Sequence, residues 1–214
     1  MCGRYFWNDE AEEAFEDDFP EFAAEVSRMR PGDYTPAMKA LALTGANTEG
    51  VKAVPAGSLA GQAVSAGSQP AAEILQWGFH GFKKGRLLIN ARAESILTKP
   101  TFSESFRNRR CALPAAGFYE WDSRKEKVIF TLPDKPILYL AGIYRFYGPE
   151  KRFVILTREA NESMAPVHDR MPLILCKEEV RLWVGDGSEA QNMLTKAMPH
   201  LKAERPYEQL TFEW

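Results

Sequence analysis

The chain has 214 residues, a 45% hydrophobic share and five tryptophans, which exclude a disordered protein and fit one domain with a sizeable core. It holds no run of eighteen apolar residues and no signal-peptide pattern, so we expect a cytoplasmic protein with no membrane association. Three widely spaced cysteines, Cys2, Cys111 and Cys176, exclude a disulfide framework and a zinc pattern, and we expect neither a metal nor an organic cofactor.

The net charge of −2 hides an uneven distribution. Residues 1–26 hold nine acidic side chains and one basic, Arg4, whereas residues 77–112 hold eight Lys or Arg against two Glu. Because local charge sets the affinity for phosphates, the second segment is compatible with a nucleic-acid surface. A solvated basic face explains the same composition equally well.

The first seventy residues predict helices, turns and a loop. Apolar residues at helical spacing over 9–29 predict one or two acidic helices, broken at Pro20 and capped by Asn8 or Asp9. Residues 30–36 are rich in turn formers, and 37–43 predict a short strand. The Ala, Gly and Ser-rich stretch 44–72 offers little to bury, so we expect a flexible surface loop there.

From residue 74 the pattern changes to short strands and tight turns. Runs rich in β-branched and aromatic residues predict strands at 74–79, 87–91, 110–114, 117–121, 128–132, 137–144, 153–157 and 173–175. Helices are predicted at 93–98, 101–108, 158–164, 177–184 and 188–197. Because strands and helices do not alternate regularly, we expect one α+β domain over 1–214, with a largely antiparallel, open barrel-like core and flanking helices.

Cys2 becomes a special residue if Met1 is removed, because it then carries a free α-amine and a thiol. The amine has a pKa near ~8 and reacts with an aldehyde to give an imine. The thiol of the same residue can then close a five-membered thiazolidine, a step favoured by proximity. An ordinary cysteine in a frayed terminus is the alternative interpretation.

Three further segments carry polar side chains suited to chemistry. In an extended Asn90–Glu94 segment, residues Asn90, Arg92 and Glu94 share one face, either as a functional surface or as a structural Arg92–Glu94 pair. Glu120 is the only charge among aromatics in 117–121, and is either a desolvated acid–base group or an exposed strand residue. His168, in the segment 168–172, can protonate a leaving oxygen near neutral pH.

Together and in this order, these segments resemble the SOS response-associated peptidase (SRAP) family from residue 2 to about 185. The matching elements are Cys2–Gly3–Arg4–Tyr5, Pro31 to Pro36, Trp77–Gly78, Asn90–Ala91–Arg92–Ala93–Glu94, Arg110–Cys111–Ala112–Leu113–Pro114, Gly117–Phe118–Tyr119–Glu120–Trp121 and His168–Asp169–Arg170–Met171–Pro172.

The resemblance implies a DNA-damage response protein that cross-links through Cys2 to abasic sites in single-stranded DNA and shields the lesion. It implies catalytic roles for Cys2, Asn90, Glu120 and His168, self-processing removal of Met1, and lyase-type character in the reverse reaction. It places DNA contacts at Arg4, Pro36, Trp77, Gly78, Arg92, Thr157, Arg170 and Met171, with Trp77 in a surface against which bases rest. We expect a monomer without an obligate protein partner. A cysteine peptidase acting on other proteins and a non-covalent single-strand binding module are the alternatives.

Overall fold

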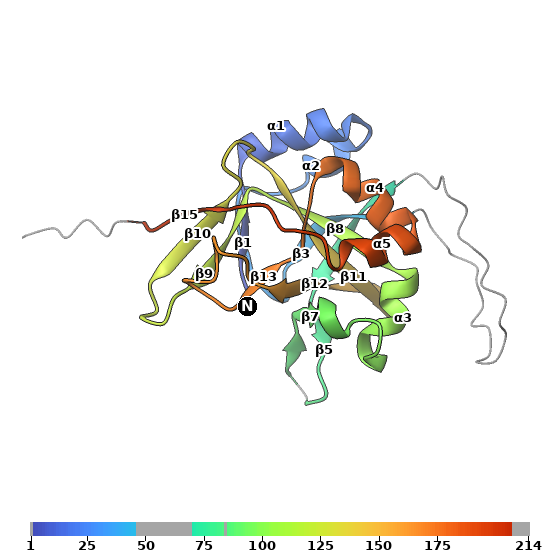
Figure 1. Cartoon of the computed structure of the whole chain (residues 1–214). Coiled ribbons are helices and arrows are strands. Elements are labelled where there is room, and N and C mark those ends of the chain that lie inside the picture. Colours follow the sequence, from blue (N-terminus) through green and yellow to red (C-terminus); the bar gives the residue numbers. More distant parts are fainter. Residues whose placement is uncertain (1, 46–69, 84, 207–214) are drawn as a thin grey trace, which may run out of the picture.

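A closed five-stranded barrel forms the centre of the molecule (Figure 1). The computed structural model describes residues 2–45, 70–83 and 85–206. The barrel strands are β3 (Lys39–Gly45), β4 (Pro70–Trp77), β8 (Arg110–Ala115), β11 (Leu138–Tyr147) and β12 (Glu150–Glu159). They follow the order β12-β4-β3-β8-β11, and β11 pairs again with β12. Only the β12–β4 pairing in this ring is parallel.

The predicted α+β class with a largely antiparallel core is therefore confirmed, although the barrel is closed. Closure follows from the length of β12, whose ten residues pair with β11 on one edge and with β4 and then β7 (Asn90–Arg92) on the other. Outside the ring, β13 (Arg170–Pro172) pairs antiparallel with the end of β12, and β14 (Ile174–Leu175) pairs with β11.

A second sheet packs the N-terminal segment against the barrel. Its order is β15 (Lys202–Glu204), β10 (Lys127–Thr131), β9 (Gly117–Trp121), β1 (Tyr5–Trp7) and β2 (Gly32–Tyr34). A separate hairpin consists of β5 (Phe79–His80) and β6 (Leu87–Leu88). The strand β1 therefore carries the residues that follow Cys2 alongside β9, with Tyr5 opposite Phe118.

The helices lie around the barrel. They are α1 (Asp9–Asp18), the 3₁₀ turn η1 (Pro20–Phe22), α2 (Ala23–Val26), the 3₁₀ turn η2 (Ala93–Ser95), α3 (Pro100–Asn108), α4 (Lys177–Gly185) and α5 (Gly187–Met193). Asn8 caps α1 by accepting a hydrogen bond from the Ala11 amide at 3.0 Å, as predicted. None of the helices among the described residues has the length and apolar character needed to cross a membrane.

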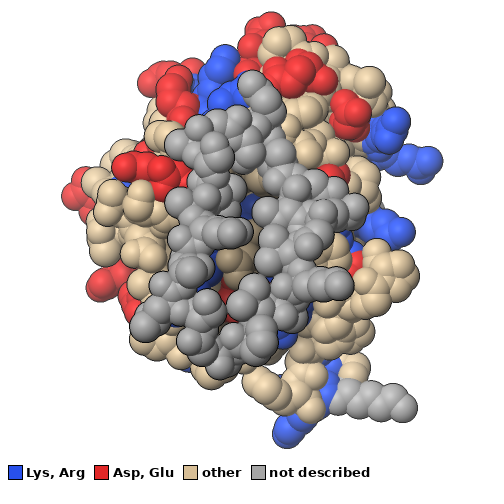
Figure 2. All heavy atoms as spheres, turned by 90° about the vertical axis from the view of Figure 1, so that its right-hand side faces the viewer, with Lys and Arg blue, Asp and Glu red and all other residues tan. Residues whose placement is uncertain are grey.

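Acidic side chains are dense at one end of the molecule, although both signs of charge occur over the face in Figure 2. Figure 2 shows Asp and Glu side chains gathered over the end that carries α1 and α2, where the first turn of α1 alone holds three of them. Lys and Arg side chains appear at the other end, where the β5–β6 hairpin projects.

Three sequence-based expectations are corrected. The predicted helix at 158–164 is wrong, because Arg158 and Glu159 pair with β13 and so satisfy their backbone in a ladder, and the residues that follow form turns. The turn-rich segment 30–36 includes the strand β2, which pairs with β1. The predicted loop 44–72 is too wide, because Thr44 pairs with Ala71 across β3 and β4; the remainder, 46–69, lies outside the described residues.

Candidate active site

The structure brings Cys2 and Asn90 together from distant parts of the sequence. Cys2 is completely buried, just before β1. Asn90 is the first residue of β7, where pairing with Ile155 of β12 fixes its position. Its Nδ2 donates a hydrogen bond to the Cys2 carbonyl oxygen at 3.0 Å. The barrel therefore holds the N-terminal segment through a side chain that the sequence singled out.

The sulfur of Cys2 is a protonated thiol at neutral pH. Burial, and secondly the Glu120 carboxylate, raise the pKa of the Cys2 thiol to about 12. Glu120 itself is 4% exposed, whereas the next residue, Trp121, is 37% exposed. The alternation of β9 thus turns Glu120 inward, so the interpretation of Glu120 as an exposed strand residue is wrong.

A cavity of about 270 Å³ opens beside Asn90. It is lined by Phe82, Leu88, Asn90, Arg92, Lys99, Thr101, Phe102 and Thr157. Two buried atoms of this lining, Asn90 Oδ1 and Thr157 Oγ1, have no hydrogen-bond partner in the part of the chain that the structure describes. Buried polar atoms usually have partners, so these two oxygens are available for hydrogen bonds to a polar group in the cavity.

The carboxylate of Glu94 pairs with Arg170, not with Arg92. Arg170 binds it in a bidentate manner at 2.7 and 2.8 Å and also donates to the Thr157 carbonyl oxygen. The Arg170 hydrogen bonds hold the pKa of Glu94 down at about 2. The proposed Arg92–Glu94 pair is therefore wrong, and Arg92 is exposed without an ion pair among the described residues. Arg170, which the resemblance places at the DNA, is engaged in this ion pair with Glu94.

His168 lies at the start of the segment that leads into β13. Its Nδ1 accepts a hydrogen bond from the Arg170 amide at 2.9 Å and lies 2.8 Å from Asp169 Oδ1. The side chain is 27% exposed. The ion pair with Glu94 holds Arg170 in place, and the Arg170 amide in turn donates the hydrogen bond to His168.

The other face of β9 carries Trp121 and a charged pair. The guanidinium of Arg4 lies over the Trp121 ring at 5.4 Å from its centroid, and its Nη1 is 3.4 Å from Asp33 Oδ2. Tyr119 donates to Asp33 Oδ1 at 2.9 Å. These contacts place Arg4, which the sequence predicts to bind DNA, beside an exposed aromatic ring.

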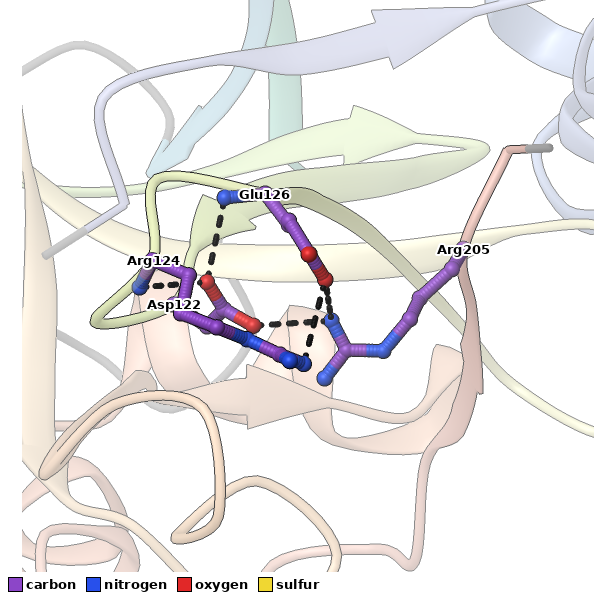
Figure 3. A network of polar contacts seen from close by, with 4 residues as sticks. All are labelled: Asp122, Arg124, Glu126 and Arg205. Carbon is purple, nitrogen blue, oxygen red and sulfur yellow. Dashed lines mark hydrogen bonds and ion pairs between the residues drawn. The ribbon is translucent and has the colours of Figure 1, made fainter. Parts of the chain in front are cut away.

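The turn that follows Trp121 is fixed by a polar network (Figure 3). Asp122 Oδ1 accepts hydrogen bonds from the amides of Arg124 and Glu126 at 2.9 and 3.0 Å. Arg205, which follows β15, reaches the carboxylates of Asp122 and Glu126 at 2.9 and 3.2 Å. The C-terminal strand thereby anchors the hairpin that carries Glu120 and Trp121.

Two residues expected at the DNA surface are buried. Trp77 is 1% exposed, stacks on Phe153 at 5.8 Å between ring centroids and donates to the Ile89 carbonyl oxygen at 3.0 Å. Met171 is completely buried. The expectation that these side chains are exposed is therefore wrong: Trp77 is buried on β4, and Met171 is buried on β13, outside the ring.

Pro36 and Gly78 both lie next to the Trp77 backbone, where they shape the course of the chain. Pro36 is half-buried, and the next residue, Ala37, donates its amide to the Trp77 carbonyl oxygen at 2.9 Å. Gly78 has φ +107°, and a Cβ there would meet the Leu87 side chain at 3.0 Å. Gly78 therefore sets the bend from β4 into the β5–β6 hairpin.

Phe82 is a surface aromatic that the sequence reasoning missed. It is 91% exposed at the tip of the β5–β6 hairpin and lines the cavity beside Asn90. The available signal was a single aromatic in the polar run Gly81–Phe82–Lys83–Lys84, which does not fit a core strand. The exposed ring of Phe82 thus lies beside the cavity, whereas the ring of Trp77 is buried.

The basic segment 77–112 does not form one face. Arg110 is 4% exposed, donates to the Trp183 and Phe106 carbonyl oxygens and so supports the core. Arg109 pairs with Glu104. Arg92 and Lys99 remain as the basic residues that line the cavity.

A larger cavity of about 710 Å³ lies elsewhere, between α1, β14 and residues 196–200. None of the predicted site residues lines it. Its size alone does not make it the site, because the smaller cavity is lined by Asn90, which bonds to the Cys2 carbonyl and, with Thr157, has an unpartnered buried oxygen.

Comparison with known proteins identifies the family. The family model for SOS response associated peptidase (SRAP) matches residues 1–211. The chain belongs to the SRAP family. It is 29% identical over 209 residues to the abasic site processing protein YoaM of Bacillus subtilis, covering 91% of this chain and 83% of that protein. It is 33% identical over 116 residues to the abasic site processing protein YedK of Escherichia coli, covering 50% and 52%.

Solved structures share the fold of this SRAP protein. A phage-related protein of Bordetella bronchiseptica superposes with a TM-score of 0.69 and 21% identity, covering 97% of this chain and 95% of that one. Another protein of the same organism superposes with a TM-score of 0.71 and 19% identity. At these identities the likeness supports the fold alone.

Proposed function

We propose that the protein captures abasic sites in single-stranded DNA by a covalent bond to Cys2 and so shields the lesion. The observation that carries this proposal is the hydrogen bond from Asn90 to the Cys2 carbonyl, beside a cavity with unpartnered buried oxygens. SRAP relatives named for abasic site processing support the same substrate.

The chemistry needs both nucleophiles of one residue. After removal of Met1, the α-amine of Cys2 attacks the aldehyde carbon of the opened sugar; a C–N bond forms and water leaves, giving an imine. The thiol then adds to the imine carbon; a C–S bond forms and the thiol proton passes to nitrogen. The product is a thiazolidine, and both additions profit from fixed proximity.

The state of the thiol favours this route over a general cysteine peptidase. A peptidase of that kind attacks with a thiolate, which needs a lowered pKa. In the chain that carries Met1, burial instead raises the pKa of the Cys2 thiol to about 12, which opposes formation of a thiolate. In the cross-linking route the amine attacks first, and the thiol donates its proton only as the ring closes.

The remaining residues take supporting roles in this proposal. Glu120, inward-facing and buried, acts as the acid–base group for imine formation, its reversal with lyase-type character, and the removal of Met1. His168 assists sugar ring opening. Arg92 and Lys99 bind phosphates, the Thr157 hydroxyl bonds to the sugar–phosphate backbone, and Phe82 stacks on an unpaired base.

A denaturing gel tests the proposal directly. Protein shown by mass spectrometry to lack Met1 is mixed with a single-stranded oligonucleotide that holds one abasic site, beside Cys2→Ala and an undamaged strand. We expect a heat-stable shifted band only with the cysteine and the lesion. Absence of the band from correctly trimmed protein would overturn the proposal. Strand binding without a band would then indicate a non-covalent binding module.

A further inference from the structure

Asp33 is a carboxylate placed between Tyr119 and Arg4, the arginine that the sequence predicts to bind DNA. It lies in β2 opposite Phe6 of β1, and its side chain is 39% exposed. One oxygen accepts the Tyr119 hydroxyl at 2.9 Å, and the other is 3.4 Å from Arg4 Nη1. Nothing in the proposed chemistry uses this acid, and an anion beside a phosphate-binding arginine works against DNA binding.

Asp33 is held by Tyr119, and the Arg4 side chain beside it is partly exposed. The hydroxyl of Tyr119 stays protonated, because burial and the Asp33 carboxylate raise its pKa to about 12, so it donates to Asp33 throughout the physiological range. Tyr119 is 8% exposed, and its ring packs on Phe6. The Arg4 side chain is 38% exposed, and among the described residues it is held by the Asp33 contact and the Trp121 ring.

Resting on the proposed function, we propose that Asp33 is an internal counter-ion that competes with the DNA phosphate for Arg4 and so weakens binding to strands without a lesion. When Arg4 turns to a phosphate, its ion pair with Asp33 breaks, and the carboxylate that Tyr119 holds in place is left facing the DNA charge. Both effects disfavour non-covalent binding. Covalent capture at Cys2 is chemically separate, so the lesion is still trapped.

Asp33→Asn tests this proposal, because asparagine keeps an oxygen that accepts from Tyr119 but carries no charge. Affinity for an undamaged oligothymidine is measured by fluorescence anisotropy over a series of salt concentrations. Exposed ion pairs contribute up to about 1 kcal/mol, so we expect about two- to fivefold tighter binding. The dependence on salt should steepen by up to about 0.7 in log–log slope, as for one added phosphate contact on a single strand.

Glu21→Gln is the matched control. Glu21 pairs with Arg181 at 2.5 Å, its side chain is 40% exposed, and its loss changes the net charge equally. Arg4→Ala and the double variant Arg4→Ala/Asp33→Asn complete a cycle in which the gain from Asp33→Asn should vanish without Arg4. Tyr119→Phe, which frees the carboxylate, should raise the affinity by a smaller factor.

The outcomes separate this inference from the proposed function. A gain no larger than that of Glu21→Gln, or one that persists in the Arg4→Ala background, overturns the role of Asp33 even if abasic strands are still cross-linked. A wild-type protein that neither binds nor cross-links strands overturns the proposed function and this inference together. Melting temperatures within a few degrees of wild type show that the fold is retained.

Discussion

Asn90 Nδ2 donates to the carbonyl oxygen of Cys2 at 3.0 Å, joining residues 88 positions apart. The bond holds the backbone of the nucleophilic residue against the end of the barrel. Asn90 is itself fixed by the parallel pairing of β7 with β12. The positions of the amine and thiol of Cys2 therefore depend on a strand formed in the middle of the chain.

We expect Asn90→Ala to slow cross-linking about tenfold, because a hydrogen bond of about 1–1.5 kcal/mol that orients the nucleophile is lost. Affinity for an undamaged strand should stay within about twofold. Single-turnover gels and anisotropy measure the two quantities. Asn108→Ala, which removes an exposed helical asparagine bonded to Glu104, is the control. Equal rates in both variants would remove Asn90 from the mechanism.

Cys2→Ser should still form an imine but no sulfur ring. We expect a link that is lost on heating and preserved only after reduction with borohydride, whereas the wild-type adduct survives heating unreduced. Cys176→Ser, at an exposed cysteine, should behave as wild type. A heat-stable unreduced adduct from Cys2→Ser would exclude the thiazolidine.

Arg92→Ala should weaken strand binding and flatten its salt dependence by about 0.7 in log–log slope, because one phosphate contact is lost. The exposure of Arg92 and its freedom from ion pairs among the described residues support this role. Arg28→Ala removes an exposed arginine beyond α2 and should leave the slope unchanged. A wild-type slope in Arg92→Ala would contradict a phosphate contact.

Phe82→Ala should weaken strand binding, whereas Trp77→Ala should destabilise the fold. Loss of stacking by the exposed Phe82 is expected to weaken strand binding by roughly 1–3 kcal/mol with the melting temperature unchanged, and Phe82→Trp should restore binding. Trp77→Ala should destabilise the fold by about 3–5 kcal/mol, because it empties part of the barrel core. Thermal melts beside anisotropy measure both effects, and unchanged binding in Phe82→Ala would refute the stacking role.

Glu94→Gln should change the acid side of the stability profile. Arg170 lowers the pKa of Glu94 in the folded protein to about 2, below its unfolded value, so the pair stabilises the fold above pH ~4.5. That contribution is lost as the pH falls from about 4.5 towards 2. Because the Glu94 side chain is 51% exposed, we expect less than about 1 kcal/mol at pH 7. Urea melts of wild type and variant should differ at pH 7 and converge near pH 2; a constant difference would contradict the pair.

Much of the local structure follows from the sequence, as three elements show. The strand β9 has the bounds predicted from its aromatic run, Asn8 caps α1, and Pro20 ends that helix region as expected. These features depend on β-propensity, capping chemistry and the missing proline amide, all of which act within a few residues. Short strands such as β1, β2 and β15 have three residues each and carry too little pattern to be predicted.

The sequence by itself determined the chemistry available: a cysteine after Met1, an amide at 90, a carboxylate at 120 and a histidine at 168. Only the tertiary structure decided which side chains face that site. In the folded chain Trp77 and Met171 are buried, Glu120 faces inward from the second sheet, Glu94 pairs with Arg170 and Phe82 stays exposed on its hairpin. The physical reason is that facing depends on pairings between distant strands, such as β7 with β12 and β1 with β9, whose partners no local pattern specifies.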